Sequence, residues 1–290
     1  MPSRKQSPAR WLELSAEVAP DAEEAVADVL RRHVHAGVSI EGGETSVVVK
    51  GYLPADGDLA RRRRALRRQL APLVSSSALR TRWLSEEDWA HVWKKFFPVL
   101  RVSPRLVVCP TWRSYRPRRG EAVIRLDPGM AFGTGQHPTT LMCLRALEEL
   151  LRPGMDVLDL GTGSGILALA AARLGATSVL ALDIDPQAAV VARENVCLNG
   201  LEAVVRVEEG GLDEAPSAAF DLAMANISAA VIVEVAAALA AVLRPGGVLI
   251  VAGFSAESAD RVSSALTGTG LAVERALADG DWRALVARRL

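Results

Sequence analysis

Short aliphatic runs alternate with helical patterns along the last 170 residues of the chain. The hydrophobic positions predict five strands, at Val157–Leu160, Ser178–Asp183, Val204–Val207, Leu222–Ala225 and Val248–Ala252. Helical patterns of about 10–15 residues separate these strands, an alternation that is typical of a parallel sheet covered on both faces. Two further apolar runs, Leu271–Glu274 and Ala284–Ala287, flank a turn-like segment at 278–281 and predict an antiparallel edge. We therefore expect a doubly covered α/β fold here.

The first hundred residues follow a different pattern. Apolar and β-branched runs predict strands at Trp11–Val18, Thr45–Val49 and Leu79–Leu84. Helices are expected from about Asp21 and over Leu59–Leu73, because their apolar positions lie near one helical face. This order of strands and helices predicts a small α+β sandwich.

Charge divides the chain in a similar place. The 290 residues are neutral overall, which indicates no particular partner, but residues 1–120 carry a net charge of +9 and residues 121–290 a net charge of −9. A basic half joined to an acidic half suggests two modules with different tasks. We place a first domain at 1–100, a linker rich in proline, glycine and arginine at 101–120, and the α/β domain at 121–290.

Six arginines lie within the eight residues Arg61–Arg68. One interpretation is a weak contact with RNA or the ribosome, since arginine clusters bind phosphate. The alternative is a solvated helix face, with leucines on the opposite face supplying the buried stripe.

The remaining composition limits the class of protein. The three cysteines, Cys109, Cys143 and Cys197, have no metal-binding or redox spacing, so we expect reduced thiols and no metal site. The N-terminus carries no apolar leader, and the most apolar region, 231–254, is interrupted by Arg244 and the Pro-Gly-Gly that follows it. We therefore expect a cytoplasmic protein without a membrane segment.

The strongest motif is VLDLGTGSG, at residues 157–165. Gly161, Gly163 and Gly165 follow a buried strand and open a helix, which is a favourable place for a ligand to approach the backbone. Eighteen residues after Gly165, the next strand ends at Asp183, which is well placed for ribose hydroxyls. The G-x-G-x-G spacing resembles that of class I methyltransferases that bind S-adenosylmethionine. A dinucleotide fingerprint would need its third glycine at Ile166.

A second unusual segment, LDPGMAFGTGQHPTT, occupies residues 126–140. It can lie over a cofactor, with Phe132 as an apolar lid and Thr139 and Thr140 as hydroxyl groups that cap a helix over Leu141–Leu151. The alternative is a tight loop before a capped helix. His137 is as well suited to a structural hydrogen bond as to a catalytic base, and no neighbouring ligands complete a metal set.

The third motif, DLAMANIS at 221–228, is a strand that ends in Asn226. An amide at the carboxyl end of a parallel strand lies where this fold places its substrates, and it can both donate to and accept from an amine. The alternative is an asparagine that only starts a turn.

Together these segments resemble the bacterial methyltransferases of large-subunit ribosomal protein eleven. The similarity rests on DPGMAFGTGQHPTT, VLDLGTGSGILALAA, ALDIDPQAAVVARENVCLNG, MANIS and RPGGVLIVAGF in order, with residues 86–112 similar to the interdomain region. The resemblance implies a ferredoxin-like N-terminal domain that recognises the substrate protein and a Rossmann-like catalytic domain. It also implies that Thr140, Gly161, Asp183 and Asn226 contact S-adenosylmethionine. Gln136 and Ser228 depart from the family's usual residues beside the transfer site.

The sequence therefore predicts an S-adenosylmethionine-dependent protein N-methyltransferase. Its expected targets are lysine side-chain or N-terminal amines of ribosomal protein eleven, with Asn226 orienting either the amine or the cofactor and Gly163 in the cofactor loop. Two alternatives remain at this point: a methyltransferase that acts on RNA or another protein, and a nicotinamide-dependent oxidoreductase.

Overall fold

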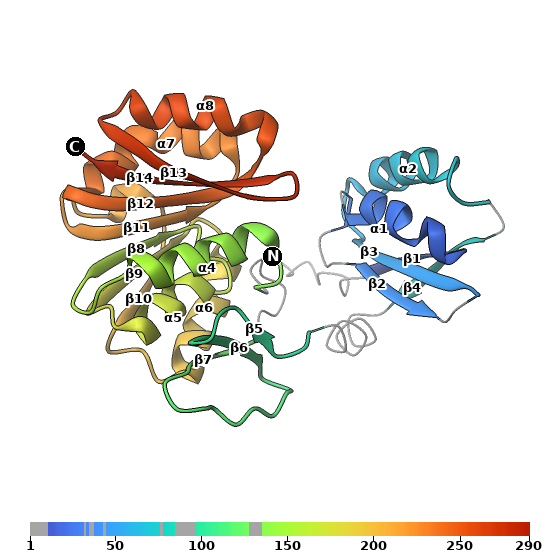
Figure 1. Cartoon of the computed structure of the whole chain (residues 1–290), viewed down its shortest axis with the longest axis horizontal. Helices are drawn as coiled ribbons and strands as arrows, with labels where there is room; N and C mark the ends of the chain where they lie inside the picture. Colours follow the sequence, from blue (N-terminus) through green and yellow to red (C-terminus); the bar gives the residue numbers. More distant parts are fainter. Residues whose placement is uncertain are drawn as a thin grey trace, which may run out of the picture. The chain divides into compact units, whose positions relative to one another are not determined.

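The chain forms two compact units, residues 1–97 and 98–290 (Figure 1). The computed structural model describes residues 11–31, 33–34, 38–42, 45–75, 78–84, 97–127 and 135–290.

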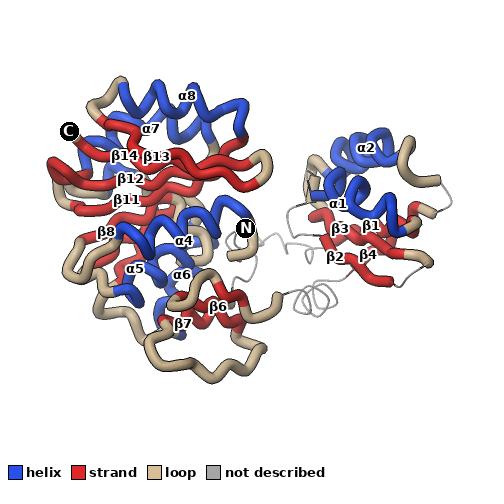
Figure 2. Tube along the Cα trace, in the orientation of Figure 1, coloured by secondary structure: helices blue, strands red, loops and turns tan. Residues whose placement is uncertain are grey.

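The first unit is a four-stranded antiparallel sheet with two helices (Figure 2). Along the chain come β1 (Trp11–Val18), a 3-10 turn (Pro20–Ala22), α1 (Glu23–Arg31), β2 (Val38–Gly42), β3 (Val47–Pro54), α2 (Leu59–Leu70) and β4 (Leu79–Leu84). The sheet order β2-β3-β1-β4 with this chain path is the split βαβ element order, and it agrees with the ferredoxin-like arrangement that the resemblance implies. Strand β2 is not among the strands predicted from the sequence, although VSIEG alternates apolar and polar residues over its first four positions; it is a short strand at the edge of the sheet.

Helix α2 carries the arginine cluster predicted from the sequence, and it ends three residues earlier than expected, at Leu70. Leu66 and Leu70 are buried in the core of this unit. Arg61 forms an ion pair with Asp58 at 3.2 Å, and Arg62 pairs with Asp56. Part of the arginine charge is therefore neutralised within the unit.

The second unit contains a seven-stranded sheet in the order β10-β9-β8-β11-β12-β14-β13. Its strands are β8 (Asp156–Leu160), β9 (Ser178–Asp183), β10 (Val205–Glu209), β11 (Phe220–Asn226), β12 (Leu243–Ser255), β13 (Leu271–Asp279) and β14 (Trp282–Arg289). The first five strands in this order, from β10 to β12, are parallel to one another, whereas β14 runs antiparallel to both β12 and β13. The predicted α/β class, parallel sheet and antiparallel edge are confirmed.

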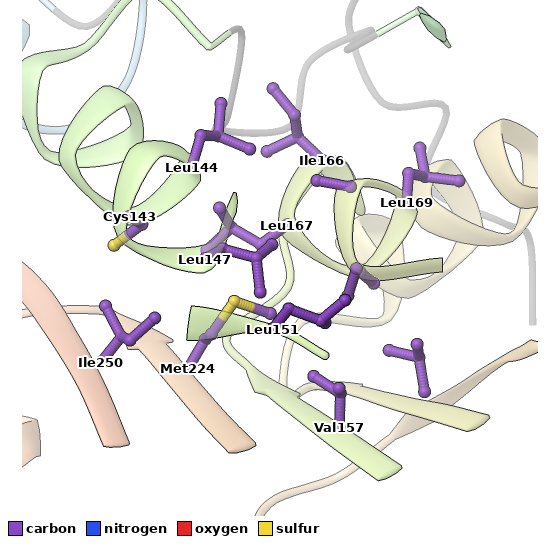
Figure 3. Close-up of a cluster of buried hydrophobic side chains, with 14 of the residues drawn as sticks. Cys143, Leu144, Leu147, Leu151, Val157, Ile166, Leu167, Leu169, Met224 and Ile250 are labelled. Carbon is purple, nitrogen blue, oxygen red and sulfur yellow. The ribbon is translucent and has the colours of Figure 1, made fainter. Parts of the chain in front are cut away.

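Helices cover both faces of this sheet (Figure 1). One face packs on α4 (Pro138–Leu150), α5 (Ile166–Leu174) and α6 (Pro186–Leu198), and the other on α7 (Ala229–Val242) and α8 (Ala256–Thr267). Figure 3 shows the first core, where Leu147 of α4 and Leu167 of α5 face Met224 and Ile250 of the sheet. The Cys143 thiol lies in this core, and burial raises its pKa above the usual value. In the described ranges, no helix is long and apolar enough to cross a bilayer.

Residues 101–120, which were expected to form a linker, contribute strands to a smaller sheet. It contains β5 (Leu100–Arg101), β6 (Leu106–Pro110) and β7 (Ala122–Leu126), with β6 parallel to β7. Two asparagines at the end of α6 anchor β7 and the residue after it. Asn195 bonds to the Asp127 backbone at 2.8 and 2.9 Å, and Asn199, the C-cap residue of α6, bonds to the Arg125 backbone at 2.9 and 2.7 Å. Prolines and arginines around β6 suggested a linker, but the run from Leu106 to Pro110 is fully buried.

Candidate functional site

Described residues of the three sequence motifs meet at one edge of the seven-stranded sheet. Strands β8, β9 and β11 are parallel neighbours, so their carboxyl ends lie side by side. Leu160 runs directly into the glycine-rich turn, β9 ends at Asp183 and β11 ends at Asn226. This carboxyl edge is where open α/β sheets bind their ligands.

The glycine-rich turn needs residues without a side chain. Gly161 adopts φ +70°, and a Cβ at this position would lie 2.4 Å from Cγ2 of Ile227. Gly161 and Thr162 donate their amides to the Leu182 carbonyl at 2.8 and 3.0 Å, which fixes the turn against β9. Gly165, at φ +83°, is the N-cap of α5 and leads into that helix. The turn therefore presents glycine backbone without side chains at the start of a helix, a favourable environment for a polar ligand.

Asp183 is held against the same turn. Its Oδ2 accepts a hydrogen bond from the Gly163 amide at 2.9 Å, and its Oδ1 accepts from the Asp185 amide at 3.0 Å. The side chain is half-buried. Each carboxylate oxygen has two lone pairs, so a carboxylate oriented by two amides can still accept from further hydroxyl groups.

Asn226 meets Thr140 although 86 positions separate them in the chain. The Asn226 amide nitrogen donates to Thr140 Oγ1 at 3.2 Å, and Thr140 is 1% exposed. Asn226 Oδ1 is buried and has no hydrogen-bond partner among the residues that the structure describes. A buried acceptor without a donor is unfavourable unless a ligand supplies one.

The start of α4 differs from the prediction. The helix begins at Pro138, and its N-cap is His137, whose Nδ1 accepts from the Thr139 amide at 3.4 Å. Thr139 and Thr140 were expected to cap this helix, but both lie inside its first turn, because the His-Pro pair already provides the start. The His137 ring makes an edge contact with Trp282 at 4.7 Å, and burial lowers its pKa. His137 therefore has a structural role in capping, which the sequence left open.

The sequence interpretation missed Asp159. This residue is 1% exposed and lies in β8, two residues before Gly161. Its Oδ2 accepts from Thr162 Oγ1 at 2.6 Å and from the Ala168 amide at 3.1 Å, while its Oδ1 has no partner within the described part of the chain. Burial raises the pKa of Asp159 to about 6. An acidic residue at the end of a buried strand, directly before a glycine turn, is the signal that could have identified it.

Two further predictions from the sequence concern an apolar lid over the cofactor and the absence of a metal site. Phe132, the expected apolar lid, falls in 128–134 and lies outside the described residues. Within the described ranges, no group of three or more histidine, cysteine or acidic side chains is arranged to hold a metal ion.

Comparisons with known proteins place the chain among methyltransferases. The family model described as "Ribosomal protein L11 methyltransferase (PrmA)" matches residues 10–290. A relative with that name from Pelotomaculum thermopropionicum is 46% identical over 96% of this chain and 98% of its own length, and one from Chloroflexus aurantiacus is 42% identical with the same coverage. The crystal structure of a ribosomal protein L11 methylase from Lactobacillus delbrueckii subsp. bulgaricus superposes with a TM-score of 0.61 at 33% identity, covering 66% of this chain and 98% of that chain. The chain therefore belongs to the ribosomal protein L11 methyltransferase family.

Proposed function

We propose that this protein transfers methyl groups from S-adenosylmethionine to lysine side-chain or N-terminal amines of ribosomal protein L11. The observation that carries the proposal is the meeting of the Gly161 turn, Asp183 and Asn226 at one edge of the sheet. Family membership supports the reaction class, and the names of the relatives support the substrate.

The residues at this edge fit the proposed cofactor. Asp183 offers a preoriented carboxylate for ribose hydroxyls, and the narrow turn at Gly161 and Gly163 lets the ligand approach the backbone. Asn226 and Asp159 each keep a buried oxygen that lacks a donor among the described residues, and the amino-acid end of the cofactor carries N–H donors. Thr140 holds the Asn226 amide in place. The segment containing Phe132 would contribute apolar contact.

The chain's own task in the reaction is alignment. S-adenosylmethionine supplies a methyl group on a sulfonium, which already has a good leaving group. The acceptor amine must be neutral when it reacts, although a lysine side chain in water has a pKa of about 10.4 and is charged at neutral pH. Removing the amine from water favours its uncharged form. Asn226 Oδ1 accepts a hydrogen bond from the amine, and this orients the lone pair of the amine nitrogen toward the methyl group. The proton released by the methylated amine passes to water.

Substrate recognition falls to the first unit in this proposal. Every cofactor motif lies from residue 126 onward, in the second unit, and none lies in the first. Helix α2 adds a weak contact with RNA or the ribosome through the arginines of Arg61–Arg68 that remain exposed. A fragment that begins at Pro98 should bind S-adenosylmethionine but methylate L11 poorly. Full activity of that fragment on L11 would remove the delivery role.

The proposed function is tested with purified L11 and deuterium-labelled S-adenosylmethionine. Mass spectrometry should find labelled methyl groups on L11 amines after incubation with the full chain, and Asp183→Ala should greatly reduce them. Calorimetry should detect binding of S-adenosylmethionine and none of NAD. Methylation of RNA or of another ribosomal protein in place of L11 would correct the substrate, and binding of NAD alone would overturn the proposal.

A further inference from the structure

The connection between β6 and β7 is an exposed arginine loop, defined here as residues 111–121. Figure 1 shows it as a long loop that extends beyond the two strands. It contains four arginines, all exposed: Arg113, Arg116, Arg118 and Arg119. From residue 102 to residue 120 the chain has no acidic side chain. The loop is therefore a basic patch on a region that is otherwise acidic, since residues 121–290 carry a net charge of −9.

A buried carboxylate fixes the base of the arginine loop. The Glu121 side chain is 3% exposed and accepts hydrogen bonds from the Arg118 amide at 2.8 Å, the Tyr115 hydroxyl at 2.7 Å and Arg101 at 2.7 Å. Arg101 also donates to the Tyr115 hydroxyl at 2.7 Å. These bonds, that from the Arg118 amide foremost, lower the pKa of Glu121 to about 2, so the carboxylate stays charged. The backbone that presents the arginines is thus ordered before any partner binds, which reduces the entropic cost of binding.

Three arginines of the loop lack an acidic partner among the described residues. Arg116, Arg118 and Arg119 form no ion pair with any residue in the described ranges. Arg118, Arg119 and Arg101 also line a hollow of about 520 Å³ next to Glu121. Three guanidinium groups and one carboxylate line this hollow, so its net charge is positive.

We propose that the arginine loop binds the phosphate backbone of RNA, with one phosphate seated in the hollow. Guanidinium groups match phosphate oxygens through paired hydrogen bonds. The choice of RNA rests on the proposed function. The proposed substrate is a ribosomal protein, and ribosomal proteins bind RNA. The loop joins the amino end of β7, whereas the motif at 126–140 follows its carboxyl end, about 17 Å along the strand. RNA held there leaves the carboxyl edge of the large sheet to the acceptor amine.

The test measures fluorescence anisotropy of a labelled 20-nucleotide single-stranded RNA with the full chain at several salt concentrations. The triple variant Arg116→Glu, Arg118→Glu, Arg119→Glu should bind at least about tenfold more weakly and lose about two units of the salt slope, at roughly 0.7 per phosphate contact. The matched helix variant, Arg64→Glu, Arg67→Glu, Arg68→Glu, changes the same charge in α2 and should lose no more than about threefold. Lysine at the three loop positions should restore most of the affinity.

Calorimetry with S-adenosylmethionine checks that both triple variants are folded. The proposal is overturned if the wild-type chain does not bind RNA, or if the helix variant loses as much affinity as the loop variant. It is also overturned if a 20-residue polyglutamate binds as tightly as the RNA, since the loop would then fit an acidic protein. RNA binding needs no methyl transfer, so failure of the proposed function would leave this measurement intact.

Discussion

The polar side chains at the two edges of the seven-stranded sheet differ in their hydrogen-bond partners. At the amino edge, Asp156 and Asp221 share one cation: Arg244 donates to Asp221 at 2.5 Å and to Asp156 at 2.7 Å. The Asp156 amide also donates to Asp221 at 2.8 Å. At the carboxyl edge, Asp159 and Asn226 each retain a buried oxygen without a partner among the described residues.

This difference separates stability from binding. The hydrogen bonds among Arg244, Asp156 and Asp221 hold the amino ends of β8, β11 and β12 together. Buried acceptors without donors cost stability in the free protein and are retained where a ligand completes them. A hollow of about 800 Å³ lies beside Arg244 at the amino edge. The contrast in hydrogen bonding, and not the size of this hollow, indicates which edge binds the cofactor.

The largest expected effect comes from a methyl group added to the glycine turn. Gly161→Ala places a Cβ 2.4 Å from the Ile227 side chain, so the turn must move. Since a displacement of about 1 Å can cost roughly a hundredfold in rate, methyl transfer should fall at least that far. The matched control is Gly154→Ala at the amino edge, where φ is +93° but no atom lies within 4 Å of the new Cβ. The control should lose stability from the same left-handed backbone and keep its activity. Equal activity of the two variants would contradict the assignment of the edges.

Asn226→Ala should lower kcat steeply. If Asn226 aligns the amine, kcat falls by about a hundredfold while the KM for the cofactor changes little. If it mainly holds the cofactor, KM rises and kcat is nearly unchanged. We expect a mixture weighted toward alignment, because Oδ1 is the atom that lacks a partner among the described residues while Nδ2 is bound to Thr140. Steady-state kinetics on L11 measures both constants, and wild-type values of both would remove Asn226 from the site.

Asp183→Ala should weaken cofactor binding at least about tenfold, because each charge-assisted hydrogen bond contributes about 1.5–3 kcal/mol. The comparison is Asp221→Ala at the amino edge, which removes a partner of Arg244. Asp221→Ala should lower the Tm and leave the Kd for S-adenosylmethionine unchanged. Calorimetry and thermal melts of both variants check this crossed pattern, and an Asp183→Ala variant with wild-type affinity would contradict it.

The sequence predicted the elements whose signals are local. The strand ends at Asp183 and Asn226, the glycine spacing and the antiparallel edge all follow from short-range pattern, because strand length and turn chemistry depend on neighbouring residues. The contact between Thr140 and Asn226 could not be predicted this way, since it joins α4 to β11 through the fold. The same is true of the buried sheet at β6, whose prolines and arginines are typical of a linker when the pairing strand is unknown.

The smallest expected effect is a difference in how the two edges respond to pH. Burial raises the pKa of Asp159 to about 6, compared with about 3.9 in the unfolded chain. Its ionisation therefore destabilises the free protein as pH rises from about 4 to 6. At Asp221, burial opposes ionisation, but the hydrogen bonds from Arg244 and the Asp156 amide outweigh it and lower the pKa. The Asp221 carboxylate therefore stabilises the fold above about pH 4, and this contribution is lost as pH falls through its lowered pKa.

Thermal melts without cofactor should find Asp159→Asn more stable than wild type by a few degrees at pH 8, with the difference shrinking toward pH 5. Asp221→Asn should be less stable than wild type at both pH values. An Asp159→Asn variant whose Tm difference from wild type stays constant between pH 5 and 8 would show that this carboxylate does not titrate there, and the two edges would then differ in hydrogen bonding alone.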